Sequence, residues 1–408
     1  MKWLWLPALV LMLAGCSDTD DFGNQEKKRV HIELKPYASS YIEDYEGALT
    51  RDGESPTGWT PPSPYVTYDN LNAKYEGQKD LTNKSIYVFF TQDNQDPMEG
   101  TFFYKNSDKT WQLNMEVEPG DYYLYGFIPK EDATSASIVA NGKYSDGAVL
   151  TINGLNTVTS SDVCVIIGAK DGSDKYNDEK PDNVRLRPGS FKTNIQATSD
   201  ASPANDIFLL FDHLYASLRF NFKVDPTYAA LRTIRLRQLE LIAYSSSSGD
   251  KVYAKFNAEI TLLKNETGVS PIVGNVRFTR NETSADVPNI PIFEGDVKLT
   301  DKATAFMGCF VPGDNTYFKL RTTYDVYDNN PAYDKEGNPI LDEKGNPMGN
   351  LVRQGCQAEN TIDLRRWFGN DLTTTRGHCY SLTMTVLPTY LYVLSDPDLE
   401  NPTLKITN

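Results

Sequence analysis

Histidine is the scarcest of the residues that carry chemistry in this chain of 408 residues. Only His31, His213 and His378 occur, and none has a second histidine or cysteine at zinc-site spacing. The sequence also lacks a nucleophile elbow, a phosphate loop and a dinucleotide fingerprint. We therefore expect no catalytic residues, no metal and no cofactor, and a protein that is not an enzyme, although two carboxylates joined by the fold would leave no sequence motif. We expect His213, beside a core strand, to be a hydrogen-bonded structural histidine.

Positive charge is also in deficit. The chain has 40 Lys and Arg against 55 Asp and Glu, so its formal net charge is −15. Such a charge repels polyanions, which excludes nucleic acid and an anionic membrane surface as partners. We assign the acidity mainly to solubility.

Cysteines are few as well, and their state is open. Besides Cys16, the chain has Cys164, Cys309, Cys356 and Cys379, which permit two disulfides in three pairings. Apolar neighbours surround Cys164 and Cys309, so we expect these two thiols to be buried and unbridged. We expect Cys356 and Cys379 to be the better candidates for a bridge.

The apolar run at the N-terminus is short. Residues 3–14 follow Lys2, and they are fewer than the roughly 20 that span a bilayer. They predict a signal peptide over residues 1–15. The run ends in Leu13-Ala14-Gly15-Cys16, which resembles the bacterial lipobox.

That resemblance implies cleavage between Gly15 and Cys16 and a lipid on Cys16. The alternative is an ordinary secretory cleavage beside an incidental cysteine. Residues 16–27 begin with an acidic run and predict a flexible tether, which also looks like the acidic export signal of Bacteroidetes surface lipoproteins.

Alternation of apolar and polar residues dominates the rest of the chain and predicts strands. Residues 111–117 and 216–224 alternate without error, and the Pro119-Gly120 turn predicts a hairpin between residues 111–117 and 122–127. Residues 231–241 could form a helix, but we favour a strand with a bulge near Gln238.

Strands at this spacing predict an all-β fold of antiparallel sandwiches. The length favours two domains, residues 28–224 and 225–408, with a boundary at Asp225-Pro226. The motif Asp-x-x-Gly-Asn-Pro occurs at residues 334–339 and again at 342–347, and we expect these tandem turns to form a protruding hairpin tip.

Three stretches resemble the fimbrillin family of Bacteroidetes, whose members are lipoprotein precursors of type V pili. They are residues 211–220 (FDHLYASLRF), residues 324–328 (YDVYD) with residues 359–364 (ENTIDL), and residues 376–398. The resemblance implies two tandem transthyretin-like antiparallel β-sandwich domains.

It also implies an assembly route. In that family an arginine-specific protease removes an N-terminal strand, and the next subunit donates a strand to the emptied groove. Carried to this chain, the displaced strand holds Val30, Ile32 and Leu34, and Arg51 is the cleavage point, with Arg29 as the alternative. Leu404 and Ile406 could belong to a donor strand or could close the second sandwich.

We therefore expect a structural subunit or anchor of a surface fimbria that contributes to cell adhesion. Its partners would be other fimbrial subunits by strand exchange, the outer membrane through the lipid anchor, and a host surface protein or glycan. The alternative is a surface glycan-binding lipoprotein that uses Trp59 or Trp367 as a sugar platform. Trp111 lies in a core-patterned strand and should be buried.

Overall fold

The computed structural model describes residues 29–44, 66–172, 186–198, 204–244, 255–265, 271–272, 275–281, 289–343, 345–390 and 397–407. Gly15, Cys16, Arg51 and Trp59 lie outside these ranges, as do the signal peptide and the tether.

Strands make up most of the described chain, which confirms the all-β prediction. The helices are short: α1 (Tyr68–Ala73), α2 (Pro226–Leu231), α3 (Leu364–Phe368) and the 3-10 turn η2 (Lys130–Asp132). Within the described ranges, no helix is long and apolar enough to cross a membrane.

The first sheet runs in the order β11-β13-β1-β6-β5-β4-β7 and closes on itself, because β11 also pairs with β7. Strand β12 pairs with β7, and β3 pairs with β1. The bounds are β1 (Arg29–Ala38), β3 (Val66–Thr67), β4 (Ser85–Thr91), β5 (Met98–Lys105), β6 (Thr110–Glu116), β7 (Gly120–Ile128), β11 (Cys164–Asp171), β12 (Lys192–Ile195) and β13 (Asn205–His213).

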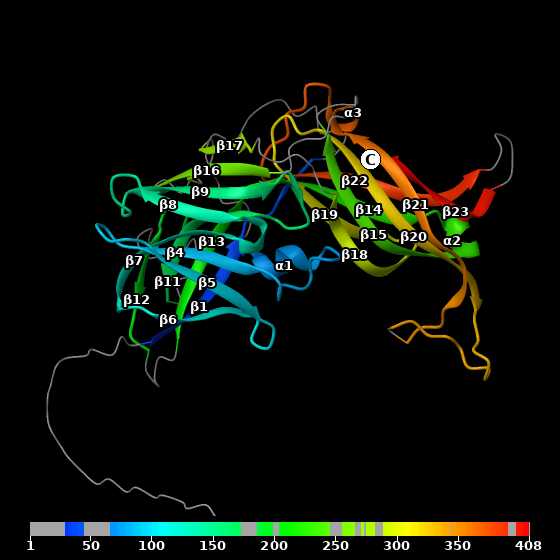
Figure 1. The fold of residues 1–408 in the computed structure, drawn as a ribbon, viewed down its shortest axis with the longest axis horizontal. Coiled ribbons are helices and arrows are strands. Elements are labelled where there is room, and N and C mark those ends of the chain that lie inside the picture. The colour runs from blue at the N-terminus through cyan, green and yellow to red at the C-terminus, as the bar shows by residue number, and fades with distance from the viewer. Residues whose placement is uncertain are drawn as a thin grey trace, which may run out of the picture.

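A four-stranded sheet lies beside the closed sheet in the same half of the molecule (Figure 1). Its order is β17 (Val276–Arg280), β16 (Lys255–Leu263), β9 (Gly147–Asn156) and β8 (Ser135–Ala140). Two of its strands therefore come from the second half of the sequence.

The other half of the molecule contains two further sheets. One has the order β10 (Val158–Thr159), β19 (Thr304–Phe310), β14 (Ala216–Val224), β22 (His378–Tyr390) and β2 (Ile42–Asp44), with β23 (Pro397–Thr407) also on β22. The other has the order β18 (Ile290–Leu299), β15 (Arg232–Tyr244), β20 (Tyr317–Pro331) and β21 (Gly349–Asp363). Aromatic pairs join the two sheets, since Phe293 contacts Phe306 and Phe310 contacts Phe318, each with ring centroids 4.9 Å apart.

The predicted boundary after Val224 does not separate the sheets. Strand β14 ends at Val224 but pairs with β19 and β22, which lie after the predicted boundary in the sequence. Strand β16 also lies after the boundary, yet it pairs with β9, which lies before it. Asp225 does end β14, but its carboxylate then caps α2 by accepting bonds from the Thr227 and Tyr228 amides. The end of a strand at Asp225 therefore does not coincide with a separation between the sheets.

Two predictions about pairing were also wrong. The sheets are not purely antiparallel, because β1 pairs in parallel with β13, and β22 pairs in parallel with β14 and β2. The predicted hairpin does not form either, since β5 and β4 separate β6 from β7 in the sheet. The bulge near Gln238 is confirmed, because the pairing of β15 shifts between Leu236 and Gln238 on both sides.

The two turn motifs form a tip that projects beyond the second half of the molecule (Figure 1). In each motif the aspartate Oδ1 accepts a bond from the asparagine amide four residues later, at 2.8 Å for both Asp334 and Asp342. This agrees with the predicted protruding hairpin, since a repeated sequence forms a repeated turn.

The four described cysteines are buried, and none of them is in a disulfide. This confirms the expectation for Cys164 and Cys309. The predicted bridge between Cys356 and Cys379 is wrong, because Cys356 lies on β21 of one sheet and Cys379 on β22 of the other.

Candidate functional site

Strand β1 is inserted in the middle of the closed sheet. It pairs in parallel with β13 from Ile32 to Ala38, and antiparallel with β6 from Arg29 to Leu34. Alternate side chains enter the core, and Val30, Ile32 and Leu34 are all 0% exposed. The chain alternates here because one face of β1 is buried and the other is partly exposed, so the strand predicted at these residues is confirmed.

After β1 the chain leaves the first half and enters the second. Residues 39–41 connect β1 to β2, and β2 pairs in parallel with the edge of β22. The Ser39 amide donates to the Phe211 carbonyl at 3.4 Å, and the Ile42 amide donates to the Gly377 carbonyl at 2.9 Å. One N-terminal segment, residues 29–44, therefore contributes strands to sheets of both halves.

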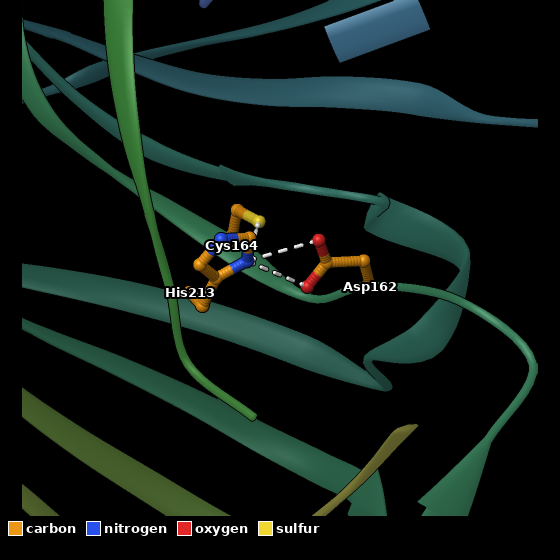
Figure 2. A group of neighbouring side chains, drawn as sticks. All are labelled: Asp162, Cys164 and His213. Carbon is orange, nitrogen blue, oxygen red and sulfur yellow. Dashed lines mark hydrogen bonds and ion pairs between the residues drawn. The ribbon is translucent and has the colours of Figure 1, made fainter. Parts of the chain in front are cut away.

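A buried polar cluster lies at this crossing point. His213 ends β13, and its Nδ1 lies 3.0 Å from Oδ2 of Asp162 and 3.6 Å from Sγ of Cys164 (Figure 2). Its Nε2 lies 2.7 Å from the Ser39 carbonyl oxygen. His213 is thus hydrogen-bonded at both ring nitrogens, as predicted, but its partners come from segments far apart in the sequence.

Electrostatics fixes the charge of this cluster. Burial would raise the pKa of Asp162, yet the ion pair with His213 holds it below its usual value. Burial would likewise lower the pKa of His213, yet Asp162 raises it above its usual value. The pair therefore favours the charged forms of both groups, and each N–H of an imidazolium would have an acceptor in Asp162 or the Ser39 carbonyl.

Asp162, Cys164 and His213 offer three potential ligand atoms within 4.8 Å of one another. Sequence spacing does not reveal this group, because His213 lies 51 residues after Asp162 and 49 after Cys164. The residues nevertheless fit a metal ion poorly, because a ligating histidine needs a lone pair on one nitrogen. Here the Ser39 carbonyl requires a proton on Nε2, and Asp162 favours a proton on Nδ1 as well. Burial also raises the pKa of the Cys164 thiol far above its usual value, so that a thiolate is disfavoured.

The sequence carried one signal for this cluster. In Asp162-Val163-Cys164 the first and third residues lie on one face if the segment is extended, which places a carboxylate beside a thiol. Their partner His213 was indicated only by its position at the end of an apolar run. Nothing local shows that residues 162 and 213 meet.

Strand β23 occupies the edge of the β22 sheet. It pairs antiparallel with β22, with Leu404 opposite Val386 and Ile406 opposite Met384. Leu404 is 5% exposed and Ile406 is partly buried against the core. In this structure the two residues therefore close the second half, which was one of the two roles expected for them.

Of the tryptophans considered as sugar platforms, Trp111 and Trp367 lie within the described residues and Trp59 lies outside them. Trp111 is 2% exposed, which confirms its burial. Trp367 is partly buried against the core, and the Arg366 guanidinium lies 6.0 Å from its ring centroid. Among the described residues, the exposed rings of Phe103 and Tyr333 belong to different halves of the molecule.

Two cavities lie on the first half. One, of about 400 Å³, is lined mainly by polar side chains, including Glu116 and Glu118. The other, of about 250 Å³, is lined by Arg187, Lys192 and Lys264 among others. Neither cavity includes a residue of the crossing segment or the buried cluster.

No protein-family model matches the sequence, and no curated protein matches it. Solved structures do match over most of their length. A candidate cell adhesion protein from Bacteroides fragilis aligns at a TM-score of 0.37 and 12% identity, covering 93% of this chain and 97% of that one. A fimbrial protein from Bacteroides vulgatus aligns at a TM-score of 0.31 and 10% identity, covering 92% and 98%. At these scores the likeness carries no weight, and the function has to come from this chain's own geometry.

Proposed function

We propose that this protein is a structural subunit or anchor of a surface fimbria that contributes to cell adhesion and is assembled by exchange of its N-terminal strand. The observation that carries the proposal is the position of residues 29–44. This single N-terminal segment fills a place between β13 and β6 and then adds an edge to β22.

The physics is that of β-strand addition. Without residues 29–44, β13 and β6 would each present an unpaired row of amides and carbonyls, and the core would have a cavity at each of Val30, Ile32 and Leu34. An extended strand from another subunit could restore both the hydrogen bonds and the alternate apolar contacts. A groove of this kind favours occupation by a strand over exposure to water.

The finer features of the proposal follow the fimbrillin resemblance. They are a lipid on Cys16 after cleavage at Gly15, attachment to the outer membrane, two transthyretin-like sandwiches, removal of residues up to Arg51, and a donor strand that includes Leu404 and Ile406.

The test is the N-terminal residue and mass of the protein on the cell surface, with and without an arginine-specific protease. We expect a new N-terminus at Asp52 and entry into detergent-resistant polymers only when the protease is present. The variants Arg51→Lys and Arg29→Lys are a matched pair, because each keeps the charge and removes one cleavage point. Polymers that form equally well from protein retaining residues 29–44 would contradict strand exchange.

A further inference from the structure

The link between β1 and β2 places a tyrosine in a buried pocket. Tyr41 is 6% exposed, and its ring stacks on the His213 imidazole with centroids 3.9 Å apart and planes inclined by 18°. Its hydroxyl lies 3.7 Å from Sγ of Cys309, on β19. The pocket is therefore built by both halves of the molecule, and the ring enters it from the N-terminal segment.

The backbone around Tyr41 is held on both sides. The Ser39 carbonyl accepts a 2.7 Å bond from Nε2 of His213, and the Ile42 amide donates to Gly377. Ser39 Oγ also donates to Asp212, at 3.5 Å. The stacked ring lies two positions after the residue whose carbonyl accepts from His213, so the pocket defines a spacing as well as a side-chain type.

The charge of the pocket favours an aromatic ring. Burial would lower the pKa of His213, but the Asp162 carboxylate beside it raises that pKa and so favours the protonated ring. The negative face of an aromatic ring attracts a cation that lies over it, and more strongly where water is excluded. An aliphatic side chain would fill the same volume without this attraction.

We propose that the Tyr41 pocket selects the strand that replaces residues 29–44, and that it takes an extended strand of a different subunit with an aromatic residue two positions after the carbonyl that His213 binds. This inference rests on the strand exchange proposed above. Strand β23 of a second copy fits poorly, because Pro397–Thr407 contains no aromatic residue. The pocket would therefore favour a partner other than this chain's own β23.

The experiment uses the full chain, cut at a sequence-specific protease site placed at Arg51. The cut protein is unfolded and refolded with equal amounts of two synthetic peptides covering residues 29–44, one with the natural sequence and one variant. Mass spectrometry then gives the ratio of the two peptides retained. The variants are Tyr41→Ala, Tyr41→Leu and Tyr41→Phe, and the matched control is Ile42→Ala, because Ile42 is 60% exposed.

We expect the natural peptide to exceed Tyr41→Ala by roughly 100-fold, as for loss of a buried aromatic side chain. Tyr41→Leu should fall between these two, while Tyr41→Phe and Ile42→Ala should remain within about threefold of the natural peptide. Bound natural peptide should also protect Cys164 and Cys309 from maleimide.

Two failures are distinguishable. If the natural peptide is not retained at all, the segment is not exchangeable, and both the proposed function and this inference are wrong. If natural and Tyr41→Ala peptides are retained equally, exchange stands and the selective pocket is overturned. The selective pocket is also overturned if the Tyr41→Leu peptide is retained as well as the natural peptide. The charge on His213 would then add nothing to the burial of an apolar side chain.

Discussion

Strands β1 and β23 lie near opposite ends of the chain and differ in how deeply they are embedded. β1 has neighbours on both sides and buries every second residue, whereas β23 pairs along one side with β22. Leaving the molecule would break the ladders of β1 with β13, β6 and β3, but only the ladder with β22 for β23. The place of β1 must be filled by another strand when β1 leaves. Strand β23 can detach with a smaller loss of hydrogen bonds, as a donor strand requires.

The largest effect should come from the buried ion pair that holds the end of β1. Asp162→Asn removes the charge that stabilises the His213 imidazolium, and breaking such a pair costs about 4 kcal/mol. Hydrogen exchange should increase in β1 and in residues 39–41 while β23 is unchanged. Equal loss of protection in β1 and β23 would mean that the pair stabilises the whole fold rather than this segment.

A pair of cavity-forming substitutions compares the two strands directly. Ile32→Ala in β1 should lower the free energy of unfolding by about 3 kcal/mol, because the residue is fully buried and enclosed on both sides. Leu404→Ala in β23 should cost about 2 kcal/mol, since an edge site can collapse more easily. Urea unfolding measures both values, and a larger cost at Leu404 would reverse the proposed roles.

A change of pH should weaken the Asp162–His213 pair that holds the end of β1, without affecting β23. The pKa of His213 is raised in the folded state, so its stabilising effect is complete below pH 6.5 and is lost as the pH rises through the raised pKa. Asp162 has a lowered pKa, so its effect is present above its usual pKa and is lost in acid.

The groups that face His213 are Asp162, Cys164, Tyr41 and Asp212, with Arg376 on its carbonyl. Burial raises the pKa of both Cys164 and Tyr41, so neither titrates in the same window. Hydrogen exchange of β1 at a series of pH values tests whether its protection falls as the pH rises through the raised pKa of His213. His213→Gln should show no such dependence above pH 6.5, and a persisting dependence would assign it to another group.

The smallest effect should come from the hairpin tip, which contacts neither strand. Replacing residues 333–347 by Asn-Gly removes side chains that are mostly exposed among the described residues, and one 3.4 Å contact between Arg235 and Asp342. Arg235 keeps its ion pair with Asp296. We expect a change within about 1 kcal/mol, since shortening a surface loop costs little. Urea unfolding again provides the measurement, and a loss above about 2 kcal/mol would show that the tip supports the core.

The individual strands were predictable because their alternation is a local property. The β1, β14 and β15 segments were found in this way, including the bulge near Gln238. Partners were not predictable, since the Pro119-Gly120 turn does not reveal that β4 and β5 come between β6 and β7. Likewise, Asp225-Pro226 ends a strand but says nothing about which sheet that strand joins.

The candidate site likewise has one part that the sequence predicts and one part that it does not. Val30, Ile32 and Leu34 follow an alternating pattern that can be read locally, because a strand with one buried face alternates regardless of its neighbours. The pocket for Tyr41 was missed, since residues 41, 162, 213 and 309 meet only through the crossing of four segments. Cys356 and Cys379 were paired by elimination, and the sheets place them on different layers.

The central claim is that β1 must leave its place for the protein to assemble. Glu33 of β1 lies opposite Gln112 of β6, so Glu33→Cys with Gln112→Cys would cross-link the strand in place. The control cross-link joins Ser137 and Thr151, which face each other on β8 and β9. The account predicts that the oxidised β1 cross-link blocks polymer formation after cleavage at Arg51, that a reductant restores it, and that the control has no effect. Polymers forming at the normal rate from the oxidised β1 variant would contradict it.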